Sequence, residues 1–111
     1  MTFTATLEST PKIAKISLSG SLDASTAPLF KAEVEKAAAQ GVKSLVLLMQ
    51  DLDYMASAGL RVLIYTKQKM GVDADIYIVG AQEMVRDTLE KTGYDQSVIM
   101  LDEYDAAQIE A

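Results

Sequence analysis

The residue of this chain best placed for regulatory chemistry is Ser57, which follows a long apolar segment. The run Leu45–Met49 is apolar at every position, which is typical of a strand covered on both faces. Apolar residues then recur at helical spacing, at Leu60, Leu63, Ile64 and Met70. This order predicts a helix that begins soon after the strand ends and places Ser57 near the helix N-cap.

A hydroxyl at a helix start is a candidate site for phosphorylation. The first amides of a helix have no partner within it, and the positive end of the helix dipole lies there, so a negative charge is tolerated. A phosphoryl group on Ser57 would add about −1.5 to −2 charges to the surface that a partner meets. A second interpretation stays open, because serine is a preferred N-cap residue and often only accepts a backbone hydrogen bond.

Few other residues offer reactive chemistry. The chain has no histidine and no cysteine, which excludes an imidazole base, a thiolate nucleophile, a disulfide and a zinc-thiolate site. The carboxylate pairs Asp51/Asp53 and Asp73/Asp75 do not have the spacing of a calcium loop, and the isolated glycines do not form a phosphate-binding loop. We therefore expect a protein that is not an enzyme and that has no metal site and no cofactor.

The charge balance restricts the partners. With 16 acidic and 10 basic side chains the net charge is −6, which disfavours nucleic acids and anionic membranes. No apolar run is long enough to cross a bilayer, and the first residues do not have the pattern of a signal peptide. We expect a cytoplasmic protein without a nucleic-acid or membrane partner.

Residues 1–111 have the size and composition of a single domain. Alternating apolar residues at 3–8 and 14–19 predict two adjacent strands, with antiparallel pairing across a turn at Ser9–Pro11. Gly20–Pro28 is predicted to be a loop. The helix that follows has an apolar stripe and ends at Gly41; its stripe is made by Phe30, Val34, Ala37 and Ala38.

The second half of the chain alternates between strands and helices. We predict a turn at Gly71–Asp75, a strand at Ile76–Val79, a helix that ends before Gly93, and a short strand at Val98–Leu101. A last helix is expected to open at Asp102 and to continue through Ile109. The order predicts an α/β fold, a mixed β-sheet of about five strands with about four helices packed against it.

Two short motifs in this framework resemble those of the STAS domain and, within it, the bacterial anti-sigma factor antagonists. Gly20–Asp23 resembles the family's Gly-x-Leu-Asp loop before the first helix, and Met55–Leu60 resembles its Asp-Ser-Ser/Thr-Gly-Leu motif at the second helix. The resemblance covers nearly the whole chain. It extends to Gly80 and to the closing stretch Asp102–Ala107.

The resemblance implies a partner switch that regulates transcription indirectly. The unphosphorylated antagonist binds an anti-sigma factor that is also an ATP-dependent serine kinase, so that the sigma factor is released. Phosphorylation by that kinase ends the complex, and a PP2C-type phosphatase restores it. By resemblance Ser57 is the acceptor, and ATP is bound by the partner.

The resemblance also implies a partner-binding surface, formed by the loop before the first helix together with the start and the exposed side of the second helix. Its residues would be Ser21, Asp23, Thr26, Met55, Ala56, Ala58, Gly59, Arg61, Val62 and Tyr65. Two positions depart from the family motif. Ala56 replaces the aspartate before the acceptor, and Ala58 replaces the hydroxyl residue after it.

Helical periodicity predicts the orientation of the second helix. Leu60, Leu63, Ile64 and Met70 are expected to face inward, with Val62 at the border. Arg61, Tyr65, Gln68 and Lys69 are expected to face outward. An exposed arginine and tyrosine one turn apart suit an interaction surface, although such residues also simply cover helices. A second functional hypothesis is therefore a STAS-type small-ligand or scaffold domain in which Ser57 is not phosphorylated.

Overall fold

One mixed sheet of five strands organises the protein. The computed structural model describes residues 3–110 and gives the strand order β1-β2-β3-β4-β5. The pair β1–β2 is antiparallel, as predicted, and the other pairs are parallel. The strands are β1 (Thr4–Ser9), β2 (Ile13–Leu22), β3 (Ser44–Met55), β4 (Asp75–Val79) and β5 (Ile99–Leu101). The predicted fold class is confirmed.

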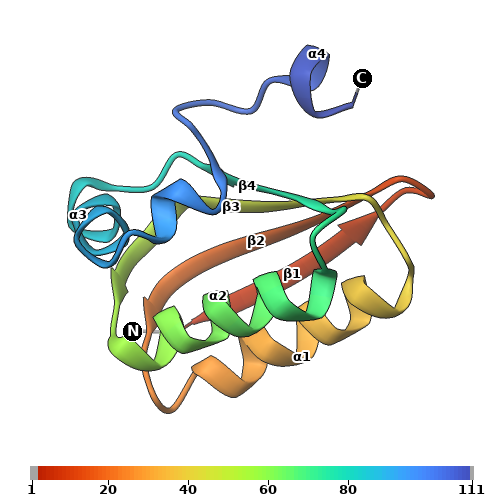
Figure 1. The fold of residues 1–111 in the computed structure, drawn as a ribbon. Coiled ribbons are helices and arrows are strands. Elements are labelled where there is room, and N and C mark those ends of the chain that lie inside the picture. Colours follow the sequence, from red (N-terminus) through yellow and green to blue (C-terminus); the bar gives the residue numbers. More distant parts are fainter. Residues whose placement is uncertain (1–2, 111) are drawn as a thin grey trace.

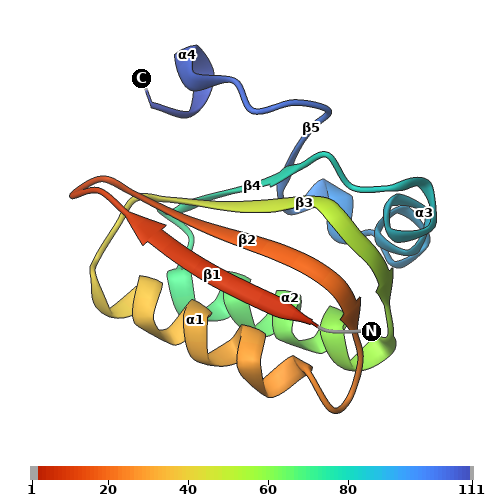
Figure 2. The same ribbon diagram turned by 180° about the vertical axis from the view of Figure 1, so that it is seen from behind.

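The two long helices lie side by side on one face of this sheet, as Figures 1 and 2 show from opposite sides. Each parallel connection moves one strand further in the same direction, and right-handed crossovers then place successive helices on the same face. The short helix α4 lies on the other face (Figure 1). The helices are α1 (Ala27–Ala39), α2 (Ser57–Met70), α3 (Glu83–Thr92), the 3-10 helix η1 (Tyr94–Gln96) and α4 (Ala106–Ile109).

The main core lies between the sheet and α1, α2 and α3. Its fully buried side chains include Ile16, Leu47, Ile78, Phe30, Leu63 and Leu89. Tyr94 of η1 closes this core, and its hydroxyl donates a hydrogen bond of 2.6 Å to the backbone oxygen of Leu63. Burial raises the pKa of Tyr94. The bond therefore joins the neutral hydroxyl to the middle of α2.

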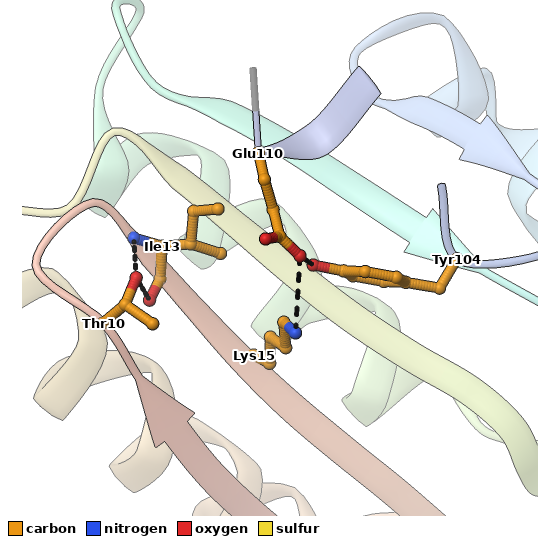
Figure 3. Close-up of polar contacts among 5 residues, drawn as sticks. All are labelled: Thr10, Ile13, Lys15, Tyr104 and Glu110. Carbon is orange, nitrogen blue, oxygen red and sulfur yellow. Dashed lines mark hydrogen bonds and ion pairs between the residues drawn. The ribbon is translucent and has the colours of Figure 1, made fainter. Parts of the chain in front are cut away.

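A second apolar cluster lies on the opposite face of the sheet, where Val46, Tyr77 and Val79 pack with Ile109 of α4. Figure 3 shows how the end of the chain is held there. The Tyr104 hydroxyl donates to Glu110, the Lys15 ammonium lies 3.9 Å from the Glu110 carboxylate, and the same ammonium lies 4.3 Å from the Tyr104 ring centre. Residues 104–110 therefore cover this face of the sheet.

Both strands that lead to the candidate site are longer than predicted. β2 continues through Gly20–Leu22, a segment that was predicted to be a loop. Gly20 has φ +86° and stands at a register shift between β2 and β3, so the glycine forms a bulge within the strand instead of ending it. β3 continues to Met55, so Asp51 and Asp53 lie on a strand and not in a loop, with Leu52 buried between them.

The last helix begins later than predicted. Asp102 pairs with Arg86 at 2.8 Å, and α4 starts at Ala106, with the Asp105 carboxylate accepting a hydrogen bond from the Gln108 amide. Because the Asp105 side chain accepts a hydrogen bond from one of the free amides of the first turn, Asp105 acts as the N-cap and the helix begins after it. The 3-10 helix was not predicted. Within residues 3–110, every helix is too short or too polar to cross a bilayer.

Candidate functional site

The candidate site forms where β2 and β3 end side by side. In the parallel register, Ser21 pairs with Tyr54 and Leu22 with Met55. The Ala56 amide then donates a hydrogen bond of 2.8 Å to the Leu22 oxygen, which ties the start of α2 to the end of β2. The loop before α1 and the first turn of α2 therefore converge at one end of the sheet, at the left in Figure 1.

The loop before α1 is fixed by its own side chains. The Asp23 carboxylate accepts from the Ser25 hydroxyl at 2.7 Å, from the Ser25 amide at 2.9 Å and from the Thr26 amide at 3.2 Å. The Ser25 hydroxyl bond, helped by these amides, lowers the pKa of Asp23, which is therefore ionised at neutral pH. The Thr26 hydroxyl donates to the Ser21 oxygen and accepts from the Asp23 amide, so it shapes the loop from within.

Ser57 is the first residue of α2 and its side chain is exposed. The N-cap is the preceding residue, Ala56, whose backbone is extended. Ser57 thus lies next to the N-cap, as predicted, and its side chain does not cap the helix. Alanine has no side-chain acceptor, and within residues 3–110 no side chain caps α2. The start of this helix therefore keeps uncapped amide donors close to the Ser57 hydroxyl.

Gly59 allows α2 to approach the sheet closely. A Cβ atom at this position would stand 2.7 Å from the Leu22 side chain and 2.8 Å from that of Met55. These separations are far below van der Waals contact, so any larger residue would push the helix start outward. Gly59 and Met55 are buried and support the site from beneath.

The buried side of α2 agrees with the prediction only in part: Leu63 is buried and Leu60 and Met70 pack against the core, as predicted, and Arg61, Gln68 and Lys69 are exposed. It consists of Gly59, Val62, Leu63 and Thr66. Val62 is buried and not at the border, whereas Ile64 is 46% exposed and does not face inward as predicted. The helix packs against both the sheet and α1, which turns the buried stripe toward Thr66. That hydroxyl is satisfied within the helix by a 2.7 Å bond to the Val62 oxygen.

Tyr65 links α2 to α1. Its hydroxyl donates to the Glu35 carboxylate at 3.1 Å, and the Lys31 ammonium lies 4.7 Å from its ring centre. The side chain is half-buried, so only part of the ring is available to a partner. Burial, and then the bond to Glu35, raise the pKa of Tyr65. Arg61, by contrast, is exposed.

The structure thus divides the predicted partner-binding residues into two groups. Met55, Gly59 and Val62 are buried, and the exposed or half-buried residues are Ser21, Asp23, Thr26, Ala56, Ala58, Arg61 and Tyr65. Three exposed apolar side chains, on α1, β3 and α2, were not among the predicted residues, namely Leu29, Tyr54 and Ile64. The position of Tyr54 directly before the Met55–Leu60 motif could have indicated it.

The site has the composition of a binding surface. Within residues 3–110, acidic side chains form no cluster of three or more that could hold a metal ion. The chain neighbours of Ser57 are small or apolar, the loop before α1 carries the ionised Asp23, and the exposed Arg61 follows Ser57 by one helical turn. This arrangement can accept a phosphoryl group and can contact another protein.

Comparison with known proteins agrees with this geometry. The STAS domain family model matches residues 4–107. An anti-sigma factor antagonist from Mycobacterium paratuberculosis superposes with a TM-score of 0.89 at 22% identity, over 99% of this chain and 96% of that one. No curated protein sequence gives a significant match.

Two further similar structures are of one protein in two states. The anti-sigma factor antagonist SpoIIAA in its unphosphorylated form has a TM-score of 0.83 at 21% identity, over 96% of this chain and 94% of that one. The Bacillus cell fate determinant SpoIIAA in its phosphorylated form has a TM-score of 0.77 at 21% identity, over 96% and 97%. These similarities show a shared fold.

Proposed function

We propose that this chain, which belongs to the STAS domain family, is an anti-sigma factor antagonist whose binding is switched by phosphorylation of Ser57. The observation that carries this proposal is the exposed position of Ser57 at the start of α2, beside the ends of β2 and β3. The similarity to SpoIIAA, which has been solved in an unphosphorylated and a phosphorylated form, supports it. In this role the protein is a regulator and not an enzyme.

The local chemistry suits a modification that leaves the fold intact. A kinase can reach the Ser57 hydroxyl because it is exposed, and the uncapped amides of α2 favour a negative charge there. Ala56 and Ala58 flank the serine, so Ser57 is the single hydroxyl in the sequence Met55–Gly59. Phosphorylation of this turn therefore has one possible acceptor.

The partner in this proposal is an anti-sigma factor that is itself a serine kinase and binds ATP. It contacts the surface around Ser57, including the loop at Asp23 and the exposed side of α2 at Arg61. A phosphate brings about −1.5 to −2 charges into this contact. Inside a desolvated contact this added charge opposes binding unless a cation of the partner meets it, so the modified protein dissociates. A PP2C-type phosphatase then returns it to the binding form in the cytoplasm.

The proposal is tested by locating the phosphate. The protein is used to isolate an anti-sigma factor kinase from native cytosol, and the two are incubated with ATP and analysed by mass spectrometry. Phosphate is expected on Ser57 in the wild type and in the matched control Ser9→Ala, where another exposed serine is lost. None is expected in Ser57→Ala, and a PP2C-type phosphatase should remove it from the wild type.

Two results would contradict the proposal. Phosphate that persists in Ser57→Ala would reject the site. If no kinase binds the wild type, the small-ligand or scaffold function would take its place. A pair of variants separates charge from size, because Ser57→Glu adds a charge and Ser57→Gln adds nearly the same volume without one. Affinity for the kinase should fall about tenfold or more in Ser57→Glu only.

A further inference from the structure

We propose that a groove between α2 and η1 anchors an apolar side chain from an acidic segment of the anti-sigma factor. This inference rests on the proposed function and names the chemistry of the partner at that site. The groove has a volume of 330 Å³ and is lined mainly by apolar surface. The lining residues on which the argument depends are Leu60, Ile64, Lys67 and Tyr94.

The groove combines an exposed apolar wall with a rigid floor. Ile64 is 46% exposed, although a side chain of this size normally gains free energy by burial. The Tyr94 ring forms the floor and is held by the 2.6 Å bond from its hydroxyl to the Leu63 oxygen. A preformed apolar pocket with a fixed aromatic floor is the kind of site that receives a hot-spot side chain of a partner.

The charge of α2 indicates the chemistry of the partner. Residues 57–70 contain Arg61, Lys67 and Lys69 and no acidic residue, in a chain whose net charge is −6. The salt bridges formed within residues 3–110 use Lys15, Lys36 and Arg86, so this helix does not contribute a cation to them.

Within residues 3–110, Arg61 in particular takes part in no salt bridge. Its side chain is exposed to solvent. A basic helix face beside an apolar groove is complementary to an acidic segment that carries an apolar residue. The partner segment is therefore expected to be acidic.

The groove and the phosphorylation site lie on one face of α2. Ile64 follows Ser57 by seven residues, which is close to two helical turns and about 10 Å along the axis. One partner segment can thus cover both. Arg61 follows Ser57 by four residues, so a phosphate on Ser57 lies within reach of its guanidinium. Phosphorylation would neutralise the cation that attracts the acidic segment, which couples the modification to the groove.

The groove is tested with the anti-sigma factor kinase isolated by the wild type, using titration calorimetry. Ile64→Glu should bind about tenfold more weakly or worse, because a carboxylate enters the apolar contact. Val72→Glu is the matched control, since Val72 is 92% exposed in the turn after α2 and should bind as the wild type does. Thermal unfolding of both variants confirms that they fold. Equal affinities of Ile64→Glu and the wild type would overturn the inference.

The acidic character of the partner is tested separately, by the salt dependence of binding. Rising salt should weaken the wild-type complex, and the double variant Arg61→Gln/Lys67→Gln should be weaker at low salt and less sensitive to salt. Tighter binding by the double variant would indicate a basic partner and reject the inference. If the wild type itself binds no kinase, the proposed function fails. If the wild type binds the kinase and the variants bind it with the same affinity and salt dependence, the proposed function stands and this inference alone fails.

Discussion

Gly59 of α2 lies so close to Leu22 of β2 that a Cβ atom on the glycine would stand 2.7 Å from the leucine side chain. The Ala56 amide also donates to the Leu22 oxygen at 2.8 Å. These two contacts fix where α2 begins relative to the end of β2. They therefore determine the position of Ser57, which stands between Ala56 and Gly59 in the chain.

We predict that Gly59→Ala destabilises the protein by about 1–3 kcal/mol, because the new methyl group overpacks the contact with Leu22 and Met55. The sign of this change in the free energy of unfolding is informative, since a glycine-to-alanine substitution at an open helix position would stabilise the protein by up to about 1 kcal/mol. Urea unfolding of the variant and of the exposed control Gln68→Ala measures the difference. An unchanged or higher stability of Gly59→Ala would show that the helix can move away at little cost.

For Ser57→Asp we predict a free energy of unfolding equal to that of the wild type or higher by about 0.3–1 kcal/mol. A carboxylate at the first position of a helix interacts favourably with its dipole, and the side chain is exposed. Thermal unfolding at low ionic strength measures the change, and added salt should reduce it. A substantial loss of stability would mean that Ser57 has a structural function.

Tyr94→Phe should alter the response of stability to alkaline pH. At neutral pH the variant is expected to be less stable by about 0.5–1.5 kcal/mol, because the bond to the Leu63 oxygen is lost. Burial raises the pKa of Tyr94 above the value of 10.0 that applies in the unfolded chain. The contribution of the neutral Tyr94 hydroxyl to the free energy of unfolding is thus fully present below pH 10, and it is lost as the pH rises from there toward the folded-state pKa.

The stability gap between the wild type and Tyr94→Phe should therefore narrow above pH 10. Urea unfolding at neutral pH and over an alkaline series measures this gap. The pKa values of Tyr65, Tyr77 and Tyr104 are also raised, chiefly by burial, but these groups are present in both proteins and cancel in the comparison. A gap that stays constant to high pH would contradict the assigned burial of Tyr94.

Ile109→Ala should loosen the C-terminal cover of the second apolar cluster. Ile109 is the buried residue of α4, and its removal leaves the short helix with little apolar contact to the sheet. We expect higher fluorescence of a hydrophobic dye and faster hydrogen exchange at residues 106–110. The exposed neighbour Gln108 serves as the control, and Gln108→Ala should match the wild type. Unchanged dye binding by Ile109→Ala would indicate that Tyr104 holds the cover without α4.

The sequence predicted the fold well where apolar residues alternate or recur regularly. The alternation in residues 3–8 and 14–19 predicted the antiparallel pair, and the apolar run Leu45–Met49 predicted the central strand. The strand ends were missed at Gly20 and at Gln50, because a bulge glycine and an exposed edge of polar residues have the composition of loops.

The candidate site was predicted less completely than the fold. Ser57 was correctly predicted to lie near the N-cap, whereas the buried side of α2 was predicted only in part: Leu63 is buried, but Ile64 is exposed. The error came from Thr66, which is polar and yet fully buried because its hydroxyl bonds to the Val62 oxygen. A helical wheel that counts only apolar residues turns the stripe toward Ile64. Packing against α1, which decides the rotation, is not contained in the local pattern.

The two faces of the sheet are completed at different times during synthesis. Because translation proceeds from the amino end, α1, α2 and α3 emerge from the ribosome early and can cover their face as soon as the parallel strands have formed. The cluster around Tyr77 and Val79 has to wait for Tyr104 and Ile109, which are made after every strand that they cover. A chain truncated before residue 104 would therefore expose this apolar face to chaperones, whereas a released chain that includes residues 104–110 would cover it.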